Sequence, residues 1–89
     1  MKIKDGFFMT EVGTDYVVIA QTPAAKKIFD GMLRLNSTGA FLWDRLLEGA
    51  SADELVSALV AEYGVDAVTA GNDSTAFLDN LRSVGLLDE

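Results

Sequence analysis

The segment MLRLNSTGAFLWDRLLEGAS, residues 32–51, contains the junction that decides the fold, because a short alternating pattern passes into a helical one within it. Side chains alternate between the two faces of a β-strand, so Leu33 and Leu35 share one face, and Met32 and Arg34 share the other. These four residues are therefore predicted to form a short strand with one fully apolar face.

A helix is predicted directly after this strand, since apolar side chains recur at the spacing of one helical face. That face consists of Gly39, Leu42, Trp43, Leu46 and Leu47. Asn36 or Ser37 is the expected N-cap, because a side-chain oxygen there can accept hydrogen bonds from the first free N–H groups. Gly49 is the expected end of the helix, and Trp43 is expected to be a core anchor.

Two further strands are predicted upstream. Residues 7–12 and 16–20 are rich in aromatic and β-branched side chains, and the turn signal GTD lies between them, which is typical of a hairpin. The run YVVIA at 16–20 is apolar on both faces and is expected to be the central strand. Residues 21–31 are expected to form a loop in which Phe29 folds back as an anchor.

Two more helices are predicted downstream. The second begins with the tetrapeptide SADE, in which Ser51 and Glu54 form a capping box, and ends at Gly64. The third has two candidate N-caps, Asp66 and Asn72, and we favour the longer helix that starts at about residue 67 and ends at 84. The apolar stripes of these two helices consist of Leu55, Val56, Leu59, Val60 and Tyr63, and of Ala70, Phe77, Leu78, Leu81 and Val84.

Three strands followed by three helices predict an α+β fold. We expect a winged-helix-like βββααα arrangement in which a three-stranded antiparallel sheet packs on three helices, because such a sheet is stable only when one face is covered. With 89 residues, the chain has the length of one small domain, residues 1–89.

The composition argues against an enzyme. The chain has no cysteine and no histidine, so disulfides, thiolate metal sites and the commonest general base are absent. The serines therefore have no histidine partner, the carboxylates fit a solvated helix face, and no phosphate-binding glycine loop is present. We expect no catalytic residue, no metal and no cofactor.

The charge pattern argues against nucleic acid. The net charge is −7, with +1 in residues 1–45 and −8 in residues 46–89. Nucleic-acid binding depends on neutralising phosphates, so the acidic half should be repelled. No apolar run is long enough to span a membrane, and the start lacks the apolar core of a signal peptide. A cytoplasmic location is the expectation.

The predicted third strand lies at an edge of the sheet, and an exposed edge offers unpaired N–H and C=O groups to another chain. Arg34 has two interpretations here: it is a charge that protects the edge from aggregation, or the edge is itself a binding site. In the second case an extended peptide would add as a fourth strand, with the third helix as the outer wall. An open edge can also pair with itself, so a homodimer is a further expectation.

The ordered set of motifs resembles the PqqD-like family, the recognition elements for ribosomally synthesised and modified peptides. The resemblance covers roughly residues 5–88. The sequence departs from the family pattern at Ser74, which follows Asp73 in place of an aliphatic residue. The matching positions are Leu35-Asn36, Thr38-Gly39-Ala40, Trp43, Gly49, Leu55, Leu59, Tyr63, Phe77-Leu78, Leu81 and Gly85-Leu86-Leu87.

The resemblance implies a non-catalytic peptide chaperone of natural-product biosynthesis. Such a protein binds the leader segment of a precursor peptide and presents the core segment to a modifying enzyme, often a radical S-adenosylmethionine (radical SAM) maturase. Carried over by position, the peptide-binding residues here are Met32, Leu33, Arg34, Leu35, Asp73, Ala76, Phe77 and Asn80.

Two alternatives remain open at this point. A winged-helix nucleic-acid module would share the fold, but its recognition helix should be basic, and here the third helix has one basic residue, Arg82, against the acidic residues Asp73 and Asp79. A structural subunit that only docks onto a partner enzyme is the other alternative.

Overall fold

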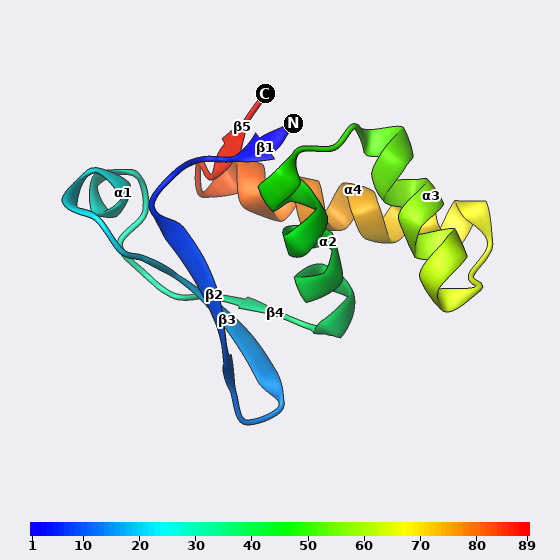
Figure 1. Ribbon diagram of the computed structural model, residues 1–89, viewed down its shortest axis with the longest axis horizontal. Helices are drawn as coiled ribbons and strands as arrows, with labels where there is room; N and C mark the ends of the chain where they lie inside the picture. The colour runs from blue at the N-terminus through cyan, green and yellow to red at the C-terminus, as the bar shows by residue number, and fades with distance from the viewer.

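The computed structural model describes all 89 residues and has five strands and four helices. Strands β2, β3 and β4 form a three-stranded antiparallel sheet, and β1 and β5 pair separately, so both chain ends lie side by side (Figure 1). The elements are β1 (Lys2–Ile3), β2 (Phe7–Val12), β3 (Asp15–Ala20), α1 (Pro23–Ile28), β4 (Leu33–Leu35), α2 (Ser37–Glu48), α3 (Ala52–Tyr63), α4 (Ala67–Ser83) and β5 (Leu87–Asp88).

The predicted α+β architecture with a three-stranded antiparallel sheet is confirmed. β3 is the central strand, with β2 on one side and β4 on the other. The two-residue turn at Gly13 and Thr14 joins β2 to β3, and Gly13 has a φ of +64° while no other residue type has a positive φ. A glycine with positive φ at the first central position is typical of a type II′ turn, whose twist matches the flanking strands.

The helices begin where their capping residues predict. Asn36 is the N-cap of α2, and its side-chain oxygen accepts a hydrogen bond from the N–H of Gly39 at 2.8 Å. Ser51 and Glu54 form the predicted capping box of α3. Asp66 is the N-cap of α4, so the longer of the two predicted helices is present, and Gly71 does not interrupt it.

One apolar core joins both sheets to the helices. Trp43 is 1% exposed, which confirms its prediction as a core anchor, and Leu33 and Leu35 of β4 are buried on the same face. Phe29 packs against this core as predicted. The core cluster consists of Ile3, Phe7, Val18, Ala25, Leu33, Leu35, Leu42, Trp43, Leu46, Leu55, Leu59, Ala70, Phe77, Leu78, Leu81, Leu86 and Leu87.

The simple βββααα order is incomplete. The loop predicted at residues 21–31 contains α1, which has Thr22 as N-cap and Pro23 in its first turn. Its six residues bury only Ala25, so the helical periodicity is too short to be recognised. The β1–β5 pair was also missed, because two strands of two residues at opposite ends of the chain carry no local pattern.

Three smaller predictions were wrong at the level of single residues. Leu47, predicted on the apolar face of α2, is exposed. β4 starts at Leu33, and Met32 lies outside it with 68% of its surface exposed. The apolar stripe of α3 is narrower than predicted, since Leu55 and Leu59 are buried whereas Val60 and Tyr63 are largely exposed. Tyr63 packs edge-to-face on Phe41 of α2, with ring centroids 5.5 Å apart.

Candidate functional site

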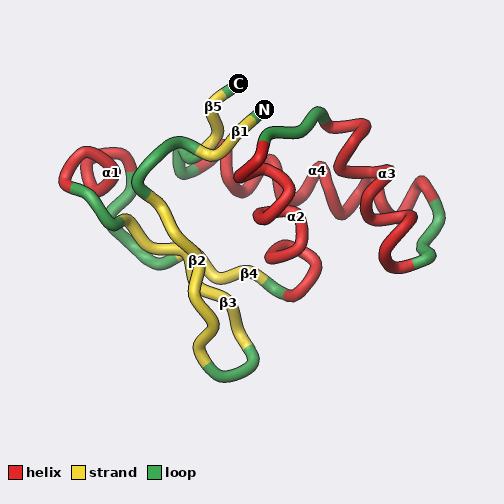
Figure 2. Tube along the Cα trace, viewed as in Figure 1, coloured by secondary structure: helices red, strands yellow, loops and turns green.

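The outer side of β4 is a free sheet edge. β4 pairs with β3 alone, and the small β1–β5 sheet is separate from it. Only Asn36 lies between the last residue of β4 and the first of α2 (Figure 2). The predicted open edge is therefore confirmed, and the start of α2 fixes its position.

One face of α4 borders this edge. Asp73, Ala76, Phe77 and Asn80 follow one another at the spacing i, i+3, i+4 and i+7, which places them on a single helical face. Phe77 is buried in the core, whereas the other three are exposed. The N-cap of this helix orders it, because the carboxylate of Asp66 accepts a hydrogen bond from the N–H of Thr69 at 2.7 Å. That bond lowers the pKa of Asp66 below its ordinary value.

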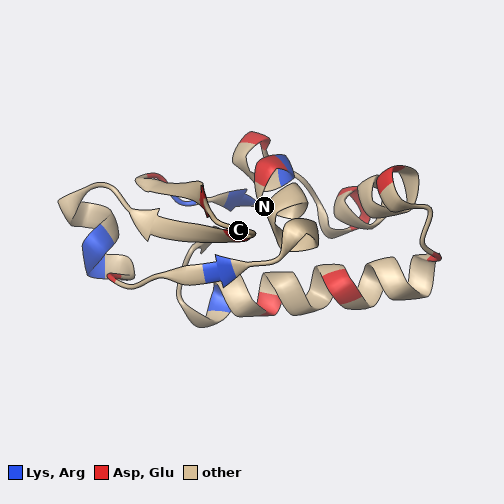
Figure 3. Ribbon diagram, turned by 90° about the horizontal axis from the view of Figure 1, so that it is seen from below, with Lys and Arg blue, Asp and Glu red and all other residues tan.

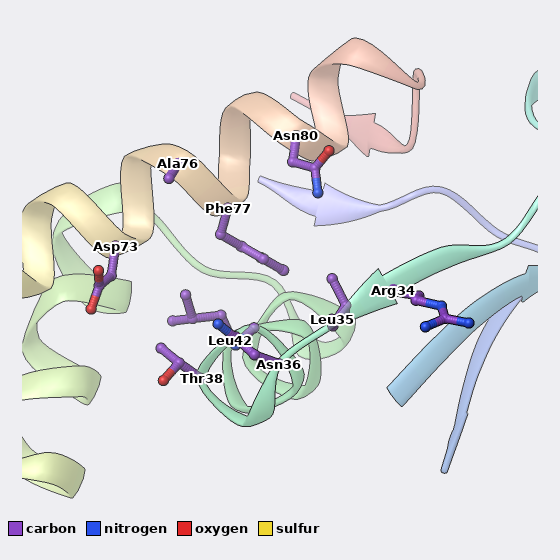
Figure 4. A pocket seen from close by; sticks show the side chains of 10 residues that line it. Arg34, Leu35, Asn36, Thr38, Leu42, Asp73, Ala76, Phe77 and Asn80 are labelled. Carbon is purple, nitrogen blue, oxygen red and sulfur yellow. The ribbon is translucent and has the colours of Figure 1, made fainter. Parts of the chain in front are cut away.

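A groove of about 280 Å³ lies between β4, the start of α2 and this face of α4. Figure 4 shows Phe77 pointing from α4 toward Leu35 and Leu42, with Asp73 and Asn80 further apart along the helix. The floor is apolar and the rim is polar, which is a common composition for a ligand site. The groove is lined by Arg34, Leu35, Asn36, Thr38, Gly39, Leu42, Asp73, Ala76, Phe77 and Asn80.

Six of the eight predicted site residues border this groove, namely Arg34, Leu35, Asp73, Ala76, Phe77 and Asn80. The other two do not. Met32 lies on the approach to β4 with its side chain exposed, and the side chain of Leu33 belongs to the core.

Sequence reasoning missed four lining residues, all from the turn and first helical turns after β4. They are Asn36, Thr38, Gly39 and Leu42. The signal was present in the segment LNSTG, because an N-cap must lie beside the edge strand when only one residue separates strand from helix. Gly39 has a second role: a Cβ there would lie 3.3 Å from the Cβ of Leu35, so a side chain would crowd the groove floor.

Arg34 is the one basic residue of the groove. Its guanidinium lies 3.4 Å from a carboxylate oxygen of Asp15 on β3, and the Arg34 side chain is 74% exposed. An exposed pair of this kind contributes little to stability. Arg34 is therefore available for a further partner.

Ser74 lies on α4 immediately after Asp73 and is 2% exposed. Its hydroxyl has no hydrogen-bond partner. This is the position where the sequence departs from the aliphatic residue of the resembled family, and the departure leaves a buried polar atom without a hydrogen-bond partner.

A second cleft lies between the β2–β3 hairpin and α2. It is lined by Met9, Thr10, Glu11, Tyr16, Ala40, Phe41 and Asp44. No cluster of three or more histidine, cysteine or carboxylate side chains in the protein is placed to hold a metal ion. None of the helices has the length and apolarity needed to cross a bilayer.

Comparisons with known proteins agree with this geometry. The model of the family described as coenzyme PQQ synthesis protein D (PqqD) matches residues 18–87. The chain belongs to the PqqD family. The match contains β4, α2, α3, α4 and the second half of β3, so the family assignment covers every element that borders the groove.

Two solved structures are similar to this PqqD-family chain. TbiB1 in complex with the TbiA(beta) leader peptide has 30% sequence identity and a TM-score of 0.76, covering 99% of this chain and 95% of that chain. Lasso peptide synthetase B1 complexed with the leader peptide has 22% identity and a TM-score of 0.71, covering 96% and 93%, and it supports the fold. No curated protein matches the sequence.

Proposed function

We propose that this protein is an adaptor that binds the leader segment of a ribosomally synthesised precursor peptide by β-strand addition. The observation that carries the proposal is the free edge of β4 beside a groove with an apolar floor. The family and the leader peptide bound by TbiB1, a relative 30% identical to this chain, support it. Residues 1–89 act as one peptide-recognition domain.

The peptide would lie between β4 and α4. The backbone groups of β4 that are not paired with β3 would supply main-chain hydrogen bonds, which give affinity without regard to sequence. Side chains of the peptide would enter the groove, which gives specificity. The proposed peptide-binding residues are Met32, Leu33, Arg34, Leu35, Asp73, Ala76, Phe77 and Asn80, to which the groove adds Asn36, Thr38 and Leu42.

The adaptor would act without chemistry of its own. A bound leader keeps the attached core peptide near the active site of a modifying enzyme, at up to roughly millimolar effective concentration when the tether is short. A radical SAM maturase is the enzyme class that the family resemblance suggests, and the cytoplasm is the compartment in which the precursor is made. When no peptide is bound, the same edge can pair with a second copy to give a homodimer.

A pair of neighbouring variants tests the site. Ala76→Glu places a charged side chain on the groove wall, whereas Thr75→Glu places the same side chain on an exposed position of α4 outside the groove. Peptides are first selected on the immobilised wild-type protein from a displayed library of random 16-residue sequences. We expect Ala76→Glu to weaken binding of a selected peptide at least tenfold, and Thr75→Glu to leave it within twofold.

Backbone amide NMR with the same selected peptide locates the site. Chemical-shift changes should concentrate at residues 32–35 and 70–80. Changes confined to α3, or equal losses of affinity in the two glutamate variants, would contradict the proposed function.

A further inference from the structure

We infer that the backbone N–H and C=O of Arg34 are the central groups that receive the added strand, and that the bound peptide carries an acidic residue opposite Arg34 between two apolar residues. The inference rests on the proposed function and specifies the class of leader that the site takes. It follows from the hydrogen-bond register of the sheet, from the direction of side chains on β4, and from the charges around the groove.

The register is fixed first in the β2–β3 hairpin. The N–H of Gln21 donates to the C=O of Gly6 at 2.7 Å, so these opposed residues form a hydrogen-bonded pair. Hydrogen-bonded pairs recur at every second position of an antiparallel ladder. They therefore include Thr10 with Val17, and Val12 with Asp15. The two-residue turn agrees, because a hairpin loop of this length is closed by a hydrogen-bonded pair.

The same alternation passes across β3 to β4. The N–H and C=O of Val17 point toward β2, so those of its neighbours Tyr16 and Val18 point toward β4. Tyr16 lies opposite Leu35, and Val18 lies opposite Leu33. The backbone N–H and C=O of Leu33 and Leu35 are therefore hydrogen-bonded to β3. Those of Arg34 point away from β3, toward the free edge.

The edge available to a peptide is short and centred on Arg34. Two residues further on, the C=O of Asn36 accepts the hydrogen bond from the N–H of Ala40 at 2.9 Å, because α2 has begun. On the other side of Arg34 the strand ends after one residue, because β4 begins at Leu33. An added strand therefore has Arg34 as its central partner and cannot continue the ladder beyond Asn36.

The register decides which peptide side chains enter the groove. In both parallel and antiparallel pairing, a residue lies on the same face of the sheet as the residue opposite it, and its two neighbours lie on the other face. The peptide residue opposite Arg34 is therefore on the outer face beside the guanidinium. Its two neighbours lie on the face of Leu33 and Leu35, where Phe77 and Leu42 form the floor.

The charges around the groove indicate which peptide side chains are favoured on each face of the sheet. The guanidinium of Arg34 has five N–H donors and a single protein partner, Asp15, so it can donate hydrogen bonds to a second carboxylate. The peptide side chains on the face of Leu33 and Leu35 contact the apolar floor of the groove. Asp73 on the rim repels an acidic side chain at these positions. The favoured peptide triplet is therefore apolar, acidic, apolar.

Amide hydrogen exchange of the peptide-free protein tests the register directly. The N–H groups of Leu33 and Leu35 should exchange slowly and that of Arg34 rapidly. Addition of a selected peptide should slow the exchange at Arg34 at least tenfold. Slow exchange at Arg34 and rapid exchange at Leu33 and Leu35 in the peptide-free protein would overturn the inference, whatever the peptide.

Peptide selection tests the side-chain preference. Peptides selected on the wild-type protein should share the apolar, acidic, apolar triplet. Selection on Arg34→Glu should replace the acidic position with lysine or arginine and retain its apolar neighbours. Arg45→Glu is the control, since Arg45 stacks on Phe41 of α2 outside this groove, and its selected peptides should match those of the wild type.

The outcomes separate this inference from the proposed function. Peptides that shift the amides of β4 and α4 but show no acidic preference, or keep it on Arg34→Glu, would overturn the triplet alone. Failure to select any peptide on the wild-type protein would overturn the proposed function and the inference together.

Two substitutions distinguish the backbone from the side chain of Arg34. Arg34→Ala removes only the ion pair and should weaken binding about twofold to fivefold, which is the range of an exposed salt bridge. Arg34→Pro also removes the outward N–H, which an edge strand tolerates without loss of its inner hydrogen bonds. We expect it to weaken binding at least tenfold relative to Arg34→Ala while far-UV circular dichroism stays unchanged; equal affinities of the two folded variants would overturn the backbone assignment.

Discussion

At the scale of single residues, Ser74 is the position where this chain loses stability for no visible gain. Its hydroxyl is buried in α4 and lacks a hydrogen-bond partner. A buried polar group without a partner costs the free energy of removing it from water, and serine is also a weaker helix former than alanine. The helical spacing places Ser74 in line with Ala70, Phe77 and Leu81, so the periodicity of α4 indicates that this position is buried although serine is polar.

Ser74→Ala should therefore stabilise the protein. We expect the free energy of unfolding to rise by about 1 kcal/mol, because the unpaired hydroxyl is removed and helix propensity improves. Urea denaturation followed by Trp43 fluorescence measures the change, since Trp43 lies in the core. Ser57→Ala is the matched control: Ser57 is an exposed residue within α3, so this variant should gain only the smaller propensity difference. Equal gains in the two variants would show that the buried hydroxyl costs nothing.

At the scale of elements, the helices follow from local chemistry and the short strands do not. Asn36, the Ser51–Glu54 capping box and Asp66 each start a helix where their side chains predict. The pairing of β1 with β5 joins residues more than 80 positions apart, so no local sequence pattern predicts it. The groove could be predicted only in part. β4 and the face of α4 follow from the sequence, but the contribution of Thr38 and Leu42 depends on how closely α2 follows β4.

The capping carboxylates make helix stability depend on pH. Hydrogen bonds from the N–H and hydroxyl of Ser51 lower the pKa of Glu54, and the N–H of Thr69 does the same for Asp66. A carboxyl whose pKa is lower in the folded than in the unfolded state stabilises the fold above its ordinary value, here 4.5 and 3.8. That contribution is lost as the pH falls through the lower folded pKa. Thermal unfolding should therefore shift to lower temperature between pH 5 and pH 3, estimated as about one unit on either side of the ordinary carboxyl pKa.

Asp66→Asn isolates one of these two groups. Asparagine caps a helix about as well as aspartate but does not titrate over this range. The variant should keep nearly the wild-type melting temperature near pH 7 and lose less of it on acidification. A pH profile identical to that of the wild type would mean that Asp66 contributes nothing to the acid sensitivity of the protein.

At the scale of the whole molecule, the distribution of charge separates a peptide adaptor from a nucleic-acid module. Figure 3 shows that α3 carries acidic residues without any basic one, and that α4 is basic only near its C-terminal end. That basic residue, Arg82, already pairs with Asp79 and Glu89 at 3.3 and 2.8 Å. The ion pair with Glu89 raises the pKa of Arg82 and lowers that of Glu89, so both groups stay charged at neutral pH. A helix with this composition presents no surface for phosphates.

The protein should therefore not bind DNA at physiological ionic strength. With a net charge of −7 and the cation of α4 paired, few phosphates could be neutralised, and counterion release would supply little affinity. An electrophoretic mobility shift assay with a random-sequence duplex at about 150 mM salt, near physiological ionic strength, measures this, and we expect no retarded band at protein concentrations that saturate a selected peptide. Arg82→Ala tests the reasoning further: if α4 contacted phosphates, any residual shift seen at low salt would vanish in this variant. A salt-dependent shift that persists at physiological ionic strength and is lost with Arg82 would favour the nucleic-acid module over the adaptor.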